Sequence, residues 1–357
     1  MEAWTAKLKT IKTLEERLAR EEILEARRDH HAKRPPRPCG ITIHTGVGCP
    51  LACAYCYIYD MGFPGAASPY RLTPLQMAYA IAANPHVAVG EWGTLVAVGS
   101  VTEPFLPETK ELAVGYMKAV AAYLGNPIQV STKMPPPAEL AEVQKGLDVL
   151  ISVTDLSGRL EPKAPSPADR LRAGAELLRR GANVTLFVRP VVPGVTDREL
   201  TRLLAYAREL GFRRVVFGTL RVTAGIAARL KAFGVDVRPY VKELHPRRQT
   251  AINYPKSRVV ATAKELGFEV LPASCASNVV AHGQACALCR WGPCGDLKKL
   301  RADPEDIREY LEARGYRGAG VAVEGLRIRL NIKISRVDKI FLEQATRLPV
   351  EEGARRG

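Results

Sequence analysis

Short apolar runs recur along the middle of the chain and alternate with amphipathic stretches. The apolar runs lie at residues 41–45, 94–101, 127–132, 147–154, 183–190 and 213–220. Runs of this kind are typical of strands that are buried on both faces of a sheet. The helix-like stretches between them indicate right-handed β–α–β crossovers, which build a parallel sheet. Six such units predict an α/β fold, a partial (β/α)6 barrel of TIM type rather than a closed barrel of eight units.

Capping signals predict where three of the helices begin. Segments 73–76 (TPLQ) and 196–199 (TDRE) both place a threonine three residues before Gln or Glu, which is the spacing of a capping box. The first of them also has proline at the first helical position. Ser166-Pro167 opens a third helix, which we expect to end at Gly181.

The two ends of the chain follow different patterns. Residues 4–30 predict one charged amphipathic helix, and the Pro-rich basic segment 33–38 predicts an extended linker. Beyond about residue 220 we expect, in order, a helix at 254–267, a strand at 268–271, a cysteine-rich loop at 275–294, a helix at 303–314 and a basic strand at 326–334. The expected division is an N-terminal helix and linker (1–38), a barrel (39–235) and a C-terminal extension (236–357).

Composition limits the environment in which the chain works. It has no run of about 18 apolar residues, so we expect no membrane-spanning helix and no membrane partner. The first 30 residues are charged throughout and lack the apolar core of a secretory signal. We therefore expect a cytoplasmic protein, in which grouped cysteines are metal ligands more often than disulfides.

The charge balance is strongly basic. The 357 residues include 52 Lys and Arg against 37 Asp and Glu, a net charge of +15. Such an excess favours an acidic partner, with nucleic acid as the first candidate. The alternative is the ion-pair-rich surface of a thermophilic protein. Among the basic residues, Arg213, Arg214, Arg221, Arg247 and Arg248 are candidates for a phosphate-binding face, whereas the histidines show no metal-ligand spacing.

A first group of cysteines follows the first predicted strand directly. Cys49, Cys53 and Cys56 have the spacing CX3CX2C and lie on a loop at the carboxyl end of that strand, where active sites of parallel barrels gather. Three thiolates suit three irons of a [4Fe–4S] cluster and leave the fourth iron open. A structural zinc ion needs a fourth protein ligand, and the nearest candidate in sequence is His44.

This motif resembles the signature of the radical S-adenosylmethionine (SAM) superfamily. The resemblance implies that the open iron is chelated by the amino and carboxylate groups of SAM. It further implies that an electron from the cluster, supplied by a donor such as ferredoxin or flavodoxin, cleaves SAM to a 5′-deoxyadenosyl radical. Cys49, Cys53 and Cys56 are then the cluster ligands.

Further motifs narrow the resemblance to the spore photoproduct lyase-like, or DNA repair photolyase-like, family. They occur in the same order over residues 41 to about 215, at 99–108 (GSVTEPFLPE), 131–133 (STK), 152–154 (SVT), 161–171 (EPKAPSPADRL) and 189–197 (RPVVPGVTD). By resemblance the cofactor contacts are Thr102 and Glu103 to the methionyl ammonium, Lys133 to the carboxylate, Ser152 to a ribose hydroxyl and Tyr55 beside the adenine.

Other positions have roles that the resemblance leaves open. Tyr57 is a candidate catalytic residue near the radical. Arg170 anchors either Glu161 or a substrate phosphate, and an arginine at a helix N-terminus is also commonly structural. In spore photoproduct lyase itself a hydrogen-donating cysteine stands two residues before the threonine that matches Thr102. Here that residue is Ser100, whose O–H bond is too strong for the same role. Repair of a thymine dimer by that mechanism is therefore not expected.

A second group of cysteines lies near the C-terminus. Cys275, Cys286, Cys289 and Cys294 have the spacing CX10CX2CX4C in a loop rich in Gly and Pro. Four thiolates suit either a second [4Fe–4S] cluster or structural zinc, and the resemblance favours iron–sulfur. His282 is an alternative ligand to Cys275. Cys39 is isolated in the sequence, and we interpret it as a core or linker residue.

The sequence as a whole predicts a radical SAM enzyme that abstracts hydrogen from a substrate, with a nucleic acid as the first candidate. One alternative is radical maturation of a peptide or protein. The other is a non-catalytic nucleic-acid-binding protein with iron–sulfur or zinc. Reductive cleavage of SAM separates the enzymes from the binding protein.

Overall fold

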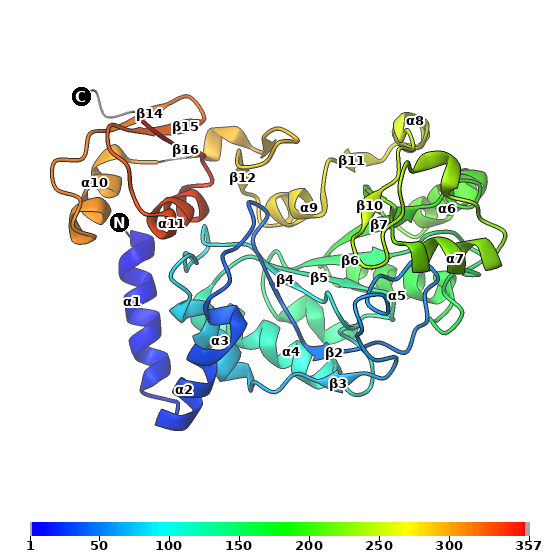
Figure 1. Cartoon of the computed structure of the whole chain (residues 1–357), viewed down its shortest axis with the longest axis horizontal. Helices are drawn as coiled ribbons and strands as arrows, with labels where there is room; N and C mark the ends of the chain where they lie inside the picture. The colour runs from blue at the N-terminus through cyan, green and yellow to red at the C-terminus, as the bar shows by residue number, and fades with distance from the viewer. Residues whose placement is uncertain (1, 301, 354–357) are drawn as a thin grey trace.

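The computed structural model describes residues 2–300 and 302–353 and confirms the predicted α/β class (Figure 1). A parallel sheet of seven strands has the order β1-β4-β5-β6-β7-β8-β11. The strands are β1 (Ile41–Ile43), β4 (Val96–Val98), β5 (Ile128–Thr132), β6 (Asp148–Ser152), β7 (Asn183–Val191), β8 (Arg214–Thr219) and β11 (Glu269–Leu271). All six predicted core strands form, and the short strand predicted at 268–271 joins the same sheet as a seventh. Its Leu271 pairs with Val216 of β8.

Alternation of side chains gives the sheet two different faces. Residues such as Ile43, Val98 and Val130 are buried in one large core with the helices that cover the outer face. These helices are α3 (Pro74–Ala83), α4 (Lys110–Ala119), α5 (Pro167–Arg179), α6 (Thr196–Glu209) and α8 (Ser257–Glu265). The opposite face contributes Leu150 and Phe187 to a smaller cluster against helix α9 (Ser274–Ala281).

Two of the three predicted helix caps are confirmed. Thr73 Oγ1 accepts the backbone N–H of Gln76, and Gln76 Oε1 accepts the N–H of Thr73 in return. Ser166 caps α5, which ends at Arg179.

The predicted capping box at 196–199 is wrong. Helix α6 is preceded by Val195 without a side-chain cap. The Thr196 hydroxyl instead accepts the N–H of Val192, and the Glu199 carboxylate accepts that of Leu156 from another loop. The hydroxyl and the carboxylate that the capping box needs are therefore both used in other hydrogen bonds.

The N-terminal prediction of one helix is also wrong. The segment forms two helices, α1 (Glu2–Glu15) and α2 (Arg20–Arg28), separated by a turn. The second helix begins where the Glu22 carboxylate accepts the N–H of Ala19 at 2.8 Å. Leu14 of the first helix and Leu18 of the turn are both buried in the core.

The C-terminal residues form a small α/β unit beside α1 (Figure 1). Its sheet has the order β14-β15-β16, and Trp4 of α1 contacts the rings of Tyr310 and Phe341 in an edge-on manner. The unit consists of α10 (Pro304–Ala313), β14 (Val321–Glu324), β15 (Arg327–Leu330), α11 (Arg336–Thr346) and β16 (Val350–Glu352). The strand predicted at 326–334 therefore ends at Leu330.

Several short elements complete the fold. The two-stranded pairs are β2 (Gly46–Val47) with β3 (Ser68–Pro69), β9 (Arg221–Val222) with β10 (Thr250–Ala251), and β12 (Ala285–Cys286) with β13 (Cys294–Gly295). Helix α7 is Ala224–Ala232, and single turns are His30–Ala32, Val120–Leu124, Ala138–Glu142, Arg238–Tyr240 and Leu297–Lys299. Within residues 2–300 and 302–353, no helix has the length and apolar character needed to cross a membrane.

Candidate functional site

The first cysteine group lies on the loop that follows β1, as the sequence predicts. Residue Gly48 fixes the path of the chain into this loop, because its φ of +86° is in the left-handed region and a Cβ there would lie 2.1 Å from the carbonyl oxygen of Ala66. Cys53 is buried, whereas Cys49 and Cys56 are partly exposed. Burial raises the pKa of all three thiols.

Two side chains outside the motif hold the cysteine loop in place. The hydroxyl of Tyr59 donates a hydrogen bond of 2.8 Å to the carbonyl oxygen of Cys49. Arg229 of helix α7 donates to the carbonyl oxygen of Cys56 at 2.7 Å and forms an ion pair with Asp60 at 2.9 Å. Loop and helix are thus connected through a planar guanidinium, which suits such multiple contacts.

The four predicted cofactor contacts follow consecutive strands of the sheet. Thr102 and Glu103 come after β4, Lys133 directly follows β5 and Ser152 ends β6. Lys133 Nζ donates to Ser152 Oγ at 2.9 Å and lies 5.4 Å from the centre of the Tyr55 ring. The structure therefore brings the predicted residues together at the carboxyl edge of the sheet, beside the cysteines.

The carboxylate of Glu103 is buried and oriented by its neighbours. Its Oε1 accepts the hydroxyl of Thr132 at 2.5 Å, and its Oε2 accepts the backbone N–H of Lys133 at 2.9 Å. Burial raises the pKa of Glu103, although these hydrogen bonds act in the opposite direction. The Oε2 atom retains capacity for a second donor.

Thr102 is the clearest sign that this site receives a ligand. Its hydroxyl oxygen is buried and has no hydrogen-bond partner in the structure. Leaving such a group unpaired costs about 1–3 kcal/mol. A ligand that carries a donor, such as an ammonium group, relieves that cost, so this side chain fits the cofactor that the sequence motif implies.

Tyr55 is fixed by a buried polar network. Its hydroxyl donates to the carboxylate of Glu161, and Arg170 donates to the same carboxylate at 2.5 Å. Arg170 also donates to the carbonyl oxygen of Ser152 at 2.7 Å. Burial and the Glu161 charge raise the pKa of Tyr55 well above its usual value, so its hydroxyl stays a donor. Of the two roles considered for Arg170, the structure has the contact with Glu161.

Tyr57 faces Ser100 across the mouth of the site. Its hydroxyl donates to the carbonyl oxygen of Ser100 at 3.2 Å and lies 3.4 Å from Ser100 Oγ. The tyrosine predicted to act near the radical therefore lies beside the residue that replaces the hydrogen-donating cysteine.

Three cationic side chains gather beyond Tyr57. Burial and the neighbouring charge of Arg221 lower the pKa of Arg189, and burial together with Arg189 lowers the pKa of Lys256. Arg213 and Arg214, by contrast, lie at the start of β8, at the other end of the sheet. The five-arginine face considered from the sequence is therefore divided between the two ends.

The second cysteine group is built by a helix and a hairpin rather than by one loop. Cys275 lies in the first turn of helix α9, which corrects the loop predicted for this segment. Cys286 and Cys294 are direct partners in the antiparallel pair β12–β13, and Cys289 lies between those strands. Cys275, Cys286 and Cys294 contact one apolar cluster, so the helix and the hairpin lie together.

Cys39 and Arg347 join this second group from distant parts of the sequence. The thiol of Cys275 hydrogen-bonds to Cys39 and lowers the pKa of Cys39 to about 6. Cys39 is exposed, so of the two interpretations, core or linker residue, the structure does not have the first. Arg347 is 1% exposed, and its guanidinium contacts Cys286 and the carbonyl oxygens of Trp92 and Gly93.

No carboxylate forms an ion pair with Arg347 in the described residues. Burial lowers the pKa of Arg347, yet a guanidinium begins so high that it stays charged. Its backbone has a φ of +60° at the end of helix α11, where glycine is the usual residue. The buried charge therefore needs anionic partners, and thiolates are the candidates beside it.

Sequence reasoning did not find Arg229, Arg347 or the contact of Cys39, because none has a local signature. The CX3CX2C spacing encodes the loop but not the helix that holds it. The Arg347-Leu348-Pro349 segment carries a partial signal, because an arginine stands at the C-terminal end of a helix, where glycine is the usual residue.

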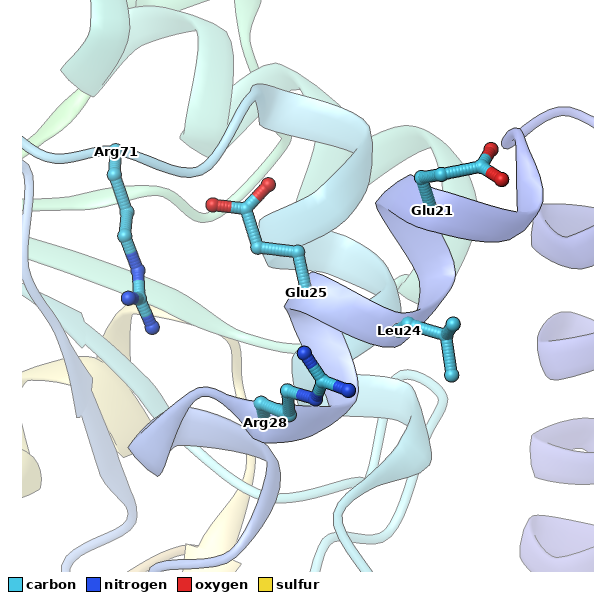
Figure 2. A pocket seen from close by; sticks show the side chains of 5 residues that line it. All are labelled: Glu21, Leu24, Glu25, Arg28 and Arg71. Atoms are coloured by element: carbon cyan, nitrogen blue, oxygen red, sulfur yellow. The ribbon is translucent and has the colours of Figure 1, made fainter.

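A separate surface hollow lies on the N-terminal helices (Figure 2). Its volume is about 310 Å³, and it is lined by Glu21, Leu24, Glu25, Arg28 and Arg71. In Figure 2 the first four side chains project from helix α2, and Arg71 projects from a facing segment of the same chain. None of the predicted site residues lines it.

Comparison with known families gives one match. Residues 43–207 match the model of the radical SAM superfamily. The matched region contains the first cysteine group and all the predicted cofactor contacts, and it ends before the second cysteine group. No match was found among the curated protein sequences.

Solved structures of spore photoproduct lyase resemble the chain in fold. A variant with bound AdoMet and dinucleoside spore photoproduct has a TM-score of 0.55 and 14% identity, over 68% of this chain and 79% of that one. A second variant has a TM-score of 0.54 and 16% identity, over 66% and 78%. A complex with dinucleoside spore photoproduct has a TM-score of 0.51 and 15% identity, over 63% and 74%. At this level of identity the likeness shows the fold alone.

Proposed function

We propose, from the match of residues 43–207 to the radical SAM superfamily model, that Cys49, Cys53 and Cys56 bind a [4Fe–4S] cluster with one open iron. When bound, this cluster supplies the electron that cleaves SAM to a 5′-deoxyadenosyl radical. The observation that carries the proposal is the unpartnered, buried hydroxyl of Thr102 beside the cysteine loop.

The polar residues around the loop divide the binding of SAM among them. The unpaired hydroxyl of Thr102 accepts a hydrogen bond from the methionyl ammonium. Glu103 accepts another through a free lone pair of Oε2. Lys133 serves the carboxylate as a point charge, with its position fixed by Ser152. Ser152 offers its hydroxyl to the ribose. The ring of Tyr55, held by Glu161, flanks the adenine.

We propose a nucleic acid or nucleotide as the substrate. The cations Arg189, Arg221 and Lys256 stand at the carboxyl edge of the sheet, on the same side as Tyr57, where a phosphate backbone reaches them. Spore photoproduct lyase is described as bound to a dinucleoside photoproduct, which is in accord with this class. Ser100 stands where spore photoproduct lyase has a thiol. The hydroxyl of Tyr57 lies 3.4 Å from Ser100 Oγ and has a weaker O–H bond than serine, so Tyr57 is the candidate catalytic residue beside it.

We further propose an iron–sulfur cluster for Cys275, Cys286, Cys289 and Cys294. The buried charge of Arg347 supports a site of several thiolates. Thiolates that come from a helix and a hairpin suit such a cluster, and tetrahedral zinc is the alternative outcome of the test.

An oxygen-sensitive cluster and eight free cysteines also favour action in the reducing cytoplasm, with ferredoxin or flavodoxin as the electron donor.

The test of both clusters is anaerobic reconstitution followed by addition of dithionite and SAM. We expect about eight irons per chain, since both clusters are cubane, and formation of 5′-deoxyadenosine. About four irons with one zinc would assign zinc to the C-terminal site. Absence of 5′-deoxyadenosine from protein with a full cluster would refute the enzyme.

The substrate class has its own test in a matched pair of variants. Arg221→Ala removes a cation near the site, and Arg213→Ala removes one at the opposite end of the sheet. We expect the first to weaken binding of single-stranded oligonucleotides and to reduce the slope of log affinity against log salt by about 1. The second should change neither. Equal effects of both variants would indicate non-specific attraction by the basic surface.

A further inference from the structure

Three histidines from two separate segments meet beside the cysteine loop. His30 and His31 form the turn after helix α2, and His44 follows β1. His30 Nε2 lies 3.2 Å from His44 Nδ1, and His31 Nε2 lies 3.3 Å from the backbone nitrogen of His44. One nitrogen from each ring lies within 4.8 Å of the other two. The remaining histidines show no metal-ligand spacing in the sequence, and the structure brings three histidines together from separate segments.

The buried carboxylate of Asp29 determines which nitrogen of His31 carries the proton. Asp29 Oδ1 lies 2.7 Å from His31 Nδ1, and both groups are fully buried. A carboxylate accepts hydrogen bonds, so Nδ1 is the protonated nitrogen, and the lone pair on Nε2 accepts the backbone N–H of His44. Asp29 Oδ2 is held by the hydroxyl of Tyr70 at 2.7 Å and by Arg71 at 2.8 Å. Hydrogen bonds from these partners keep the pKa of Asp29 well below its usual value despite burial.

The same partners orient His30. Tyr70 donates its hydroxyl proton to Asp29, so its oxygen is free to accept from His30 Nδ1 at 3.2 Å. The lone pair of His30 then lies on Nε2, which faces His44. A metal ion here takes the lone pair of His31 Nε2 from the backbone N–H of His44. The Nδ1 atoms of His31 and His30 are held by a carboxylate and a phenol. This is the arrangement that orients histidine ligands in metal sites.

We propose that His30, His31 and His44 bind one divalent transition metal ion of the zinc class. Zinc bound to imidazole at about 2.0–2.1 Å has ligand nitrogens about 3.3 Å apart in a tetrahedron. The separation of 3.2 Å between His30 Nε2 and His44 Nδ1 fits such an edge. With three protein ligands the fourth position stays open to water, and the half-exposed His30 side chain gives the ion a path from solvent.

The site would connect the N-terminal helices to the cysteine loop. His44 directly precedes the β2–β3 ribbon that leads to Cys49, and the backbone N–H of Tyr70 donates to the carbonyl oxygen of Thr45 at 3.0 Å. An ion held by His44 and the 30–31 turn therefore ties the start of the ribbon to the N-terminal helices. The proposal concerns imidazole ligands and does not depend on cluster chemistry.

The test uses the full chain with its cysteine sites first reconstituted with iron and sulfide, followed by zinc chloride and gel filtration. We expect one zinc per chain, and X-ray absorption at the zinc edge should show only nitrogen or oxygen neighbours at about 2.0–2.1 Å. His44→Ala should reduce zinc to background. His245→Ala, which removes a histidine near helix α7, should retain it.

A second variant covers the event that His44→Ala fails to fold. Asp29→Asn removes the carboxylate that orients His31 and should weaken zinc affinity about 10–100-fold, without removing a ligand. Failure of the wild-type chain to retain zinc, or sulfur neighbours at about 2.3 Å, would overturn the proposal. Retention of the same zinc spectrum by a folded His44→Ala chain would do so as well.

Discussion

The two cysteine groups lie at opposite ends of the same parallel sheet. The first follows β1 and faces Thr102, Lys133 and Ser152, which all stand at carboxyl ends of strands. The second contacts Cys39, which precedes β1, and Arg347, which binds Trp92 and Gly93 just before β4. The length of strand β5 alone separates the carboxyl end of the sheet from its amino end by on the order of 15 Å.

This difference in position indicates a difference in role. Residues at the carboxyl end of a barrel carry chemistry, whereas those at the amino end contribute stability. The first group has an unpaired hydroxyl beside it, ready for a ligand, while the second has a buried guanidinium that completes it. We infer that the proposed second centre stabilises the fold.

Cysteine variants give the largest effect and separate the two centres. Cys53→Ser should reduce formation of 5′-deoxyadenosine to background and remove about four of about eight irons, because a cubane loses a ligand. Cys289→Ser should remove the other irons and preserve cleavage of SAM. Iron analysis and chromatography of the nucleoside measure both. Loss of cleavage in Cys289→Ser with the first cluster still present would show that the second centre takes part in catalysis.

Arg347→Met tests whether the buried charge belongs to the second centre. Removal of one partner from a buried charge pair costs about 3–5 kcal/mol, because the thiolates lose their compensation. We expect that loss in the free energy of unfolding by urea, together with loss of the C-terminal metal. Arg327→Met, at an exposed ion pair with Glu351, is the control and should cost less than about 1 kcal/mol. Equal costs for the two variants would contradict the assignment.

The pH dependence of stability sharpens the picture of the amino end. Asp148 is buried under helix α9, where it accepts from Gln129 at 2.5 Å and Ser277 at 2.9 Å. Burial raises the pKa of Asp148 from 3.8 to about 6. The folded state then binds more protons than the unfolded state between these values, so stability falls as pH rises through them.

Between pH 5 and pH 8 the wild-type chain should lose about 1.4 kcal/mol from this group. Asp148→Asn should lack that component, and the difference between the two chains in urea unfolding isolates it. A parallel pH dependence of the two chains would mean that Asp148 titrates normally.

Thr102→Val should give the smallest effects. It should raise the stability of the chain without SAM and lower its affinity for SAM. Without SAM the variant should be more stable by about 1 kcal/mol, because an unpaired buried hydroxyl is removed. Its affinity for SAM should fall about tenfold, which corresponds to about 1.4 kcal/mol. Calorimetry and unfolding by urea measure the two effects. A loss of stability without SAM would show that the hydroxyl has a partner within the protein.

The sequence predicted those features that depend on residues close together in the chain. The six strands follow from apolar runs, and the cysteine loop follows from a motif of eight residues at the end of β1. The order of Thr102, Lys133 and Ser152 on successive strands was predictable because parallel strands place their carboxyl ends at one edge. Their convergence is what the structure adds.

The features that the sequence did not predict depend on contacts between distant residues. Arg347 and Cys39 meet the second cysteine group across most of the chain, and no periodicity encodes such a contact. His30 and His44 come from the turn after α2 and the position directly after β1, and no local pattern encodes their contact. The capping box at 196–199 failed for the same reason, since Glu199 is used by a loop some 40 residues away.

The way in which Arg347 completes the C-terminal cysteine group has a consequence for biosynthesis. The ligands of the first cluster are all made within eight residues of each other, so that loop can be loaded as soon as the sheet around it has formed. The second centre must wait, because Arg347 is synthesised more than 300 residues after Cys39. For the proposed C-terminal centre, this order of synthesis places its completion after that of the first cysteine loop.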